Sequence, residues 1–217
     1  HLTMKILITG AAGFIGYHLS KELLRYDYEI IGLDNLNDFY DLNLKKDRLK
    51  ILSKHKNFNF VKSDINDLDL IYKEPIDLII NLAAQAGVRS SEKNFVNYLS
   101  SNMNGFFHLL DFAKNKKIKN IIFASSSSVY SSVNKTPFSE EEELYSPSSF
   151  YGSTKLFNEN LAKIYHQLYG INFIGLRFFT VYGNYGRPDM AYFKFASNII
   201  AVSYTHLTLP TIGTVLV

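Results

Sequence analysis

The sequence contains no cysteine. This absence excludes disulfide bonds, thiolate metal sites and cysteine nucleophiles. The chain also lacks an apolar run long enough to cross a bilayer, and its start shows no basic segment followed by an apolar one, as a secretory leader would. We therefore expect a cytoplasmic protein that has no membrane partner.

Neither a metal site nor a nucleic-acid surface is indicated. The six histidines lack the spacing of metal ligands, so we expect no metal. The net charge is only +3, and no basic stripe is interleaved with the 17 phenylalanines and 15 tyrosines, so we expect no nucleic-acid partner. The hydrophobic content of 47% over 217 residues is enough for one sizeable core.

Short apolar runs alternate with helical patterns along the chain. This alternation predicts an α/β fold, a Rossmann-like doubly wound parallel sheet with helices on both faces. The predicted strands are residues 5–9, 29–33, 59–61, 78–82, 121–124 and 173–178, and the predicted helices are residues 14–25, 96–114 and 150–169. Ligands of such sheets bind at the carboxyl ends of the strands. The polar, small or acidic residues expected there are Gly10, Asp34, Asp64, Ala84, Ser126 and Thr180.

A glycine triplet follows the first predicted strand. Gly10 permits a tight turn, Gly13 lets a pyrophosphate approach the helix N-terminus, and Gly16 allows close packing of helix on strand. The triplet alone is weak evidence, but the second predicted strand ends in Asp34. A carboxylate there can accept hydrogen bonds from both adenosine ribose hydroxyls and would repel a 2′-phosphate. The sequence therefore predicts NAD rather than NADP as cofactor.

A tyrosine and a lysine, Tyr151 and Lys155, are spaced one helical turn apart on one face of a predicted helix. A phenol with a pKa of about 10 is a poor base unless a cation stabilises its anion, and Lys155 is placed to be that cation. The spacing by itself also fits an ordinary exposed pair, and the preceding serine run, residues 125–128, also fits a simple turn. Read with the glycine triplet, the pair indicates redox chemistry on a hydroxyl group.

Together with Asn-Leu-Ala-Ala at residues 81–84 and Arg-Phe-Phe-Thr at residues 177–180, these motifs resemble the extended short-chain dehydrogenase/reductase family. The nucleotide-sugar epimerases of that family are the most similar group. Residues 34–41, 84–89 and 186–191 resemble UDP-glucuronate 4-epimerases in particular. The resemblance runs from about Met4 to Ile200, with departures at Phe95, at Ser131 and at residues 184–185.

The resemblance implies a role for each matching residue. It makes Ser126, Tyr151 and Lys155 catalytic, with Ser127 and Ser128 as alternative positions for the serine. It implies that the cofactor is bound by Gly10, Gly13, Phe14, Ile15, Gly16, Asp34, Asn35, Asp64, Ile65, Leu82, Ala83, Ala84, Asn102, Tyr151, Lys155 and Phe179. The substrate-binding residues would be Arg89, Ser127, Ser128, Thr180 and Arg187.

Arg187 is the candidate for holding a sugar carboxylate, because a guanidinium binds a carboxylate bidentately. Arg89 is the reserve candidate, and a surface ion pair between Arg187 and Asp189 is the structural alternative.

The implied reaction is NAD-dependent epimerisation of UDP-glucuronate to UDP-galacturonate through transient oxidation at C4, in a homodimer. Dehydratases of the family carry Asp-Glu after the catalytic serine or threonine, where this chain has Ser127 and Ser128, and the glutamate of the decarboxylases is also missing. A UDP-glucose/UDP-galactose-type 4-epimerase and, more remotely, a non-catalytic NAD-binding protein remain open as alternatives.

One domain is predicted over residues 4–200, an NAD-binding domain without the substrate-binding C-terminal region of the family. Residues 201–217 carry none of the family's motifs that we recognise, and the tripeptide His-Leu-Thr at the start recurs at residues 206–208. We therefore expect residues 201–217 to be a non-native tail.

Overall fold

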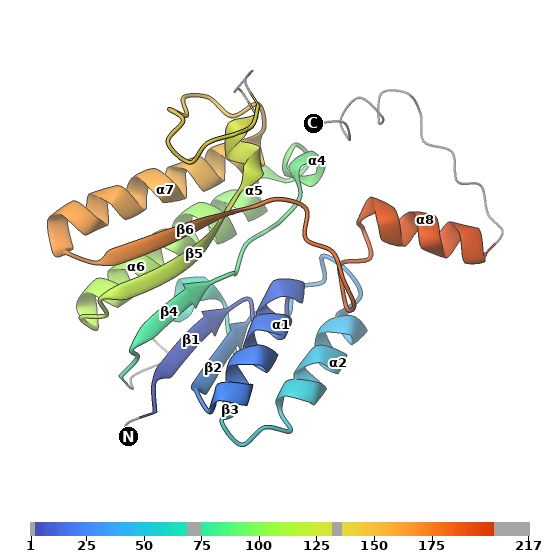
Figure 1. Ribbon diagram of the computed structural model, residues 1–217, viewed down its shortest axis with the longest axis horizontal. Coiled ribbons are helices and arrows are strands. Elements are labelled where there is room, and N and C mark those ends of the chain that lie inside the picture. The colour runs from blue at the N-terminus through green and yellow to red at the C-terminus, as the bar shows by residue number, and fades with distance from the viewer. Residues whose placement is uncertain (1–2, 69–74, 132–135, 202–217) are drawn as a thin grey trace.

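The computed structural model describes residues 3–68, 75–131 and 136–201, which form a parallel sheet with helices on both faces (Figure 1). The sheet has six strands in the order β3-β2-β1-β4-β5-β6. Their bounds are β1 Lys5–Thr9, β2 Glu29–Asp34, β3 Phe58–Lys62, β4 Leu78–Asn81, β5 Asn120–Ser126 and β6 Asn172–Phe178. This order is that of doubly wound dinucleotide-binding folds, so the predicted fold class is confirmed.

The helices are α1 Phe14–Leu23, α2 Leu42–Leu52, α4 Val88–Ser91, α5 Phe95–Tyr98, α6 Gly105–Asn115, α7 Phe150–Tyr169 and α8 Ala191–Ile200. Shorter helical turns are η1 Leu24–Tyr26, η2 Ile65–Asp67, η3 Leu99–Asn104 and η4 Ser127–Tyr130.

Alternate residues of β1 enter two different cores, one on each face of the sheet. Ile6 and Ile8 belong to a cluster that contains Tyr17 of α1, whereas Leu7 belongs to a cluster that contains Phe106 of α6. Successive side chains of a strand point to opposite faces, so the unbroken apolar run of β1 is buried from both sides. The central strands are therefore held between α1 and α2 on one face and α6 and α7 on the other.

Burial on both faces does not extend to the edge of the sheet. In β6, Ile174 is 57% exposed and Leu176 is 38% exposed. Helix α8 buries none of its residues, and Figure 1 shows it projecting beside the sheet. The prediction that helices cover both faces is thus correct for the inner strands but not for β6.

The structure corrects several predicted elements. The predicted helix 96–114 is divided into α5, the π-helical turn η3 and α6. Helices α2, α4 and α8 were not predicted. Helix α2 lacked an apolar pattern because its buried face carries two cations, Lys45 and Arg48, beside Leu49 and Leu52. Hydrophobic periodicity detects only helices whose buried face is apolar.

Apart from Ala201, the predicted non-native tail lies outside the described residues. Within the described ranges, no helix is long and apolar enough to cross a membrane. The same ranges contain no group of three or more metal-binding side chains.

Candidate active site

The carboxyl ends of the strands surround one cavity of about 640 Å³. All the residues that the sequence indicated as catalytic, cofactor-binding or substrate-binding line this cavity, with the exception of Asn102. The segments that contribute them are distant in the sequence, from the turn after β1 to the loop after β6. The topology therefore brings the predicted motifs together.

The turn between β1 and α1 closely approaches the end of β4. Gly10 has a φ of 69°, and a Cβ atom at this position would lie 2.8 Å from the backbone nitrogen of Ala83. At Gly16 a Cβ atom would lie 2.2 Å from the Gly10 carbonyl oxygen. Both positions therefore require glycine, and the turn leads directly into the N-terminus of α1, which is suited to bind a pyrophosphate.

The carboxylate of Asp34, which ends β2, is buried and already has several partners. Its Oδ2 accepts the Ala12 N–H at 3.2 Å, and its Oδ1 accepts the Leu36 N–H at 2.9 Å. The Lys45 ammonium lies 3.5 Å from Oδ1. A carboxylate has about four acceptor positions. Two are taken by backbone groups and Lys45 approaches a third, so Asp34 has room for one ribose hydroxyl rather than the two we expected.

Asp64 and Asn35 line the same end of the cavity and bind each other. The Asn35 amide donates to Asp64 Oδ2 at 2.8 Å, and Asn66 donates its backbone N–H to Asp64 Oδ1 at 3.0 Å. Burial acts to raise the Asp64 pKa, but the hydrogen bonds from Asn66 and Asn35 outweigh it and lower the pKa. Asp64 is therefore an ionised acceptor beside the predicted nucleotide site.

Asn102, expected to contact the cofactor, lies behind the cavity wall instead. Its side chain accepts the Gln85 N–H at 2.8 Å, donates to the Gln85 carbonyl at 3.0 Å and donates to Thr154 at 3.1 Å. These contacts link the segment after β4 to α7. Asn102 therefore supports the wall in this structure, and its contact with the cofactor stays a prediction.

Tyr151 and Lys155 lie on the side of α7 that faces the end of β5. Ser149 caps α7 by accepting the Gly152 N–H at 3.0 Å, which places Tyr151 in the first turn. The Lys155 ammonium donates to the Ala124 carbonyl at 2.9 Å and lies 5.8 Å from the centre of the Tyr151 ring. The structure thus brings the predicted pair together at the cavity.

The electrostatics of the pair differ from the expectation. Burial raises the pKa of Tyr151, while a hydrogen bond with Ser126 and the charge of Arg187 act to lower it. We expected Lys155 to be the cation that lowers the Tyr151 pKa, but burial instead lowers the pKa of Lys155 itself to about 8. Without bound ligands, Tyr151 is a neutral phenol.

Ser126 ends β5 and caps η4. Its hydroxyl accepts the Ser128 N–H at 3.1 Å and donates to the Ser128 hydroxyl at 3.2 Å. The preceding Ser125 donates to Glu159 of α7 at 2.5 Å, and Arg177 of β6 holds Glu159 through two bonds of 2.8 and 3.0 Å. This partly buried ion pair fixes the end of β5 against α7.

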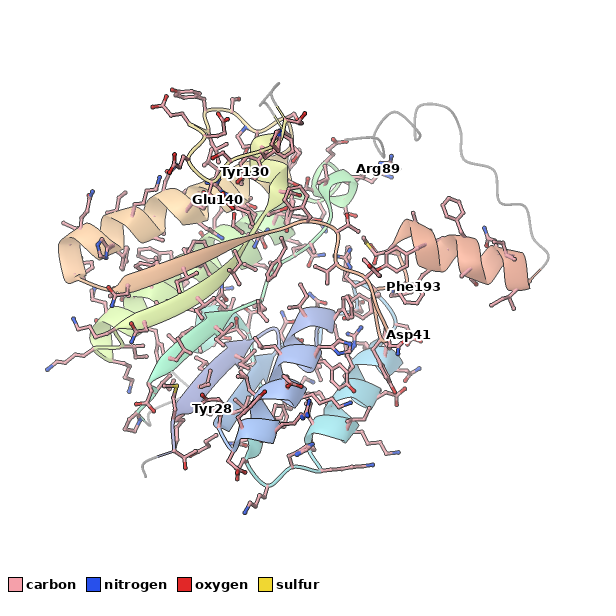
Figure 2. The ribbon with its side chains drawn as sticks, viewed as in Figure 1. Tyr28, Asp41, Arg89, Tyr130, Glu140 and Phe193 are labelled. Atoms are coloured by element: carbon pink, nitrogen blue, oxygen red, sulfur yellow. The ribbon has the colours of Figure 1, made fainter. Side chains whose placement is uncertain are left out.

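Arg177 also reaches the segment after η4. Its Nη1 donates to the Tyr130 hydroxyl at 2.7 Å and to the Glu140 carbonyl at 3.3 Å, and Figure 2 shows both residues in this region. One side chain therefore joins β6, η4 and the loop beyond it, next to the serine run.

Arg187 combines two arrangements that the sequence presented as alternatives. It lines the cavity, and it also pairs with Asp189 through Nε–Oδ1 and Nη2–Oδ2 contacts of 3.0 and 2.5 Å. The pair occupies the Nε edge of the guanidinium. Among the described residues nothing bonds to Nη1, so the other edge can still bind a carboxylate. Arg89, the reserve candidate, is exposed on α4 (Figure 2).

The loop that carries Arg187 is held by α1 and α2. Arg48 of α2 is fully buried and donates to the Ala12 carbonyl at 2.8 Å and to the Tyr185 carbonyl at 2.5 Å. His18 of α1 lies 2.7 Å from the Asn184 carbonyl oxygen. Residues 184 and 185, where the sequence departs from the family, are therefore held against α1 and α2 through their backbone oxygens.

The residues of the cavity wall that sequence reasoning did not assign to the site include Asn37, Tyr40, Lys45 and Asp189. The segment 34–41 was considered only as a family-like stretch, and Asp189 only as part of such a stretch and as a possible ion-pair partner of Arg187. Lys45 had no signal at all, since the helix that places it was not predicted.

Comparisons with known proteins agree with this site. Residues 6–214 match the model of the NAD dependent epimerase/dehydratase family. The chain belongs to this family. Its relatives include an uncharacterized protein of Methanocaldococcus jannaschii, 52% identical over 90% of this chain and 62% of that protein. UDP-glucuronate 4-epimerase 2 of Arabidopsis thaliana is 46% identical over 91% of this chain and 46% of that protein.

Among solved structures, UDP-glucuronic acid 4-epimerase from Bacillus cereus in complex with UDP-glucuronic acid and NAD superposes with a TM-score of 0.83 at 37% identity. The match covers 92% of this chain and 64% of that chain. The resemblance to NAD-dependent nucleotide-sugar epimerases is thereby confirmed. The chain spans less than two thirds of the length of these three relatives.

The lowered pKa of Lys155 makes stability depend on pH. The folded-state value of about 8 lies below the unfolded value of about 10.4, so the unfolded chain binds more protons between these pH values. The free energy of unfolding should therefore rise with pH across this window. This rise in the free energy of unfolding, roughly 3 kcal/mol in the wild type, should be absent in Lys155→Met.

Urea unfolding at a series of pH values from about 7.5 to 10.5 measures this difference. Lys163→Met, an exposed position on the same helix, is the control and should keep the wild-type dependence. Equal pH slopes for wild type and Lys155→Met would contradict the assignment.

Proposed function

We propose that the protein is an NAD-dependent 4-epimerase of a UDP-sugar, with UDP-glucuronate as its substrate and UDP-galacturonate as its product. One observation carries the proposal: Tyr151, Ser126 and Arg187 line the same cavity as Asp34 and the glycine turn. A base, a hydroxyl donor and a carboxylate-binding cation therefore lie next to a dinucleotide site. This combination suits transient oxidation of a sugar hydroxyl.

The residues present fit NAD. The turn at Gly10 leaves no space for a side chain, the N-terminus of α1 opens into the cavity, and Asp34 offers an acceptor to the ribose. When bound, NAD supplies the acceptor and donor of the hydride at C4 and a positive charge near Tyr151.

Tyr151 acts as the general base toward the 4-hydroxyl of the sugar. Burial keeps its phenol neutral, so deprotonation needs positive charge, which Arg187 and, when bound, the cofactor supply. The Lys155 ammonium lies 5.8 Å from the centre of the ring. Ser126 donates a hydrogen bond to the sugar oxygen and keeps it in line with the phenol. In the return step Tyr151 gives the proton back, now on the opposite face of the ring.

Arg187 favours an acidic sugar. Its Nε edge is bound to Asp189, which leaves the Nη1 edge for a substrate carboxylate. A neutral hydroxymethyl group would gain much less from a guanidinium at this position. A UDP-glucose/UDP-galactose-type epimerase is the second candidate, because the ion pair with Asp189 already satisfies part of the guanidinium.

Other chemistry is less well supported. Ser127 and Ser128 lie where a dehydratase needs an acid and a base, so elimination of water has no catalyst here. A non-catalytic NAD-binding protein would have no use for Tyr151, Lys155 and Ser126 in one wall of the cavity.

The homodimer and the cytoplasmic location implied by the sequence stay predictions. For the homodimer, light scattering after size exclusion, on a form extended to the length of the relatives, should give twice the monomer mass. A monomer mass across the accessible concentrations would contradict it.

Replacement of the base tests the chemistry. In a form of the protein extended to the length of its relatives, Tyr151→Phe should lower turnover by about 10²- to 10⁴-fold, because the hydroxyl transfers the proton. UDP-glucuronate binding should stay nearly unchanged, since the ring keeps its packing against Tyr98. Turnover by product analysis and binding by calorimetry separate the two effects. Tyr26→Phe, an exposed position, is the control, and near-normal turnover of Tyr151→Phe would show that another base acts.

Replacement of the guanidinium tests the substrate. In the same extended form, Arg187→Leu should reduce the preference for UDP-glucuronate over UDP-glucose by about tenfold or more, because a bidentate charged contact is lost. Kinetic measurement of kcat/KM for both sugars gives the ratio. Arg25→Leu, an exposed arginine paired with Glu22, is the matched control. An unchanged ratio in a folded Arg187→Leu protein would favour the neutral-sugar alternative.

A further inference from the structure

The adenosine end of the cavity contains a buried cation that the proposed function does not use. Lys45 reaches the cavity from α2, and its side chain is only 6% exposed. Its ammonium lies 3.5 Å from Asp34 Oδ1, the acid that faces the adenosine ribose. A group attached to the ribose 2′-oxygen would therefore meet Lys45 as well as Asp34.

The contacts of Lys45 leave it able to bind another acceptor. An ammonium has three N–H donors. One donates to Asn37 Oδ1 at 2.8 Å and another points to Asp34, while the Tyr40 ring lies 5.4 Å below the charge. No other acceptor for Lys45 is found among the described residues. One donor is thus available to a ligand in the cavity.

The second buried cation of α2, Arg48, cannot take this role. Arg48 is fully buried and is not part of the cavity wall. Its Nη1 and Nη2 are bonded to the Ala12 and Tyr185 carbonyls and to the Tyr40 hydroxyl. Lys45 is therefore the cation of α2 that a ligand at the ribose can reach.

The ion pair between Asp34 and Lys45 changes how the site would discriminate between NAD and NADP. An isolated carboxylate would repel a 2′-phosphate by charge, but Asp34 and Lys45 together carry no net charge. A 2′-phosphate would be repelled by one member of the pair and attracted by the other. Discrimination then depends on the balance between the two side chains, not on Asp34 alone.

We propose that Lys45 is a specificity-determining residue of the cofactor site. Its ammonium would bind a 2′-phosphate, and the Asp34 carboxylate prevents a phosphate from binding there. The inference rests on NAD binding in this cavity. Removal of the Asp34 charge should expose a buried ammonium beside the ribose, and this ammonium binds a phosphate in place of the lost carboxylate. Removal of Lys45 should leave an unpaired carboxylate that excludes NADP more strongly.

The test is a double-mutant cycle with Asp34→Asn, Lys45→Met and the combined variant, on the chain as it stands and freed of nucleotide. Calorimetry gives the dissociation constants of NAD and NADP, and their ratio is the quantity compared. Asp34→Asn should shift the ratio toward NADP by about tenfold or more, and Lys45→Met should shift it several-fold toward NAD. The combined variant should lose the gain in NADP binding.

Two controls isolate the lysine. Lys46→Met removes the same charge from the next residue of α2, which is exposed, and should leave the ratio unchanged. Adenosine 2′,5′-bisphosphate and AMP differ only in the 2′-phosphate, so they should reproduce the effect without the nicotinamide half. Lys45→Arg in the Asp34→Asn background keeps the charge and should keep the gain, and circular dichroism verifies the fold of each variant.

Two results would overturn the inference. One is a shift toward NADP in Asp34→Asn that persists when Lys45 is also replaced, and the other is a ratio in Lys45→Met equal to that of wild type. Either result, with NAD still bound, would leave the cofactor assignment intact. Absence of NAD binding by the wild-type chain would overturn the cofactor assignment and the inference with it.

Discussion

The site depends on how closely the ends of β1 and β4 approach each other. The Thr9 hydroxyl donates to Asn81 at 2.5 Å and accepts the Ala83 N–H at 3.1 Å, and the Thr9 carbonyl accepts the Leu82 N–H at 3.2 Å. These strands are the point where the strand order reverses, which is where ligands bind in doubly wound sheets. Only a glycine fits between them at Gly10. The cavity forms because the segment after β1 and the segment after β4 run in opposite directions from this contact.

Buried polar contacts hold the remaining walls in place. Lys155 binds the Ala124 carbonyl, Glu159 binds Ser125, and Ser126 caps η4, so consecutive residues of β5 are each held by a separate contact. A buried charge is costly unless it is paired or hydrogen-bonded, and such contacts specify one geometry because few arrangements satisfy them. The lowered pKa of Lys155 shows that part of this cost remains. Several separate polar contacts thus hold the wall that carries the chemistry.

Sequence patterns predicted the elements that bury apolar faces and missed those that do not. The limits of β1 and α7 were predicted correctly, because β1 has an apolar centre, Ile6 to Ile8, and α7 has a regular apolar spacing. Helix α2 was missed because Lys45 and Arg48 face the interior, and α8 was missed although it is apolar. Helix α8 buries none of its residues and contacts the loop after β6 through Tyr192. The consequence reaches the site, because α2 carries the cation beside Asp34. Because α2 was not predicted, the charge of Lys45 at the site was not predicted either.

The sequence by itself determined the fold class and the family, and it predicted most of the residues that carry the chemistry. The glycines, the acid after β2 and the Tyr/Lys pair one turn apart are recognisable because local geometry dictates their spacing. Tertiary structure alone decided how those members interact. It paired Asp34 with Lys45 and Arg187 with Asp189, moved Asn102 behind the wall and kept the Tyr151 phenol neutral. Charge pairing and desolvation depend on atoms brought together from distant segments, and no periodicity in the sequence records those distances.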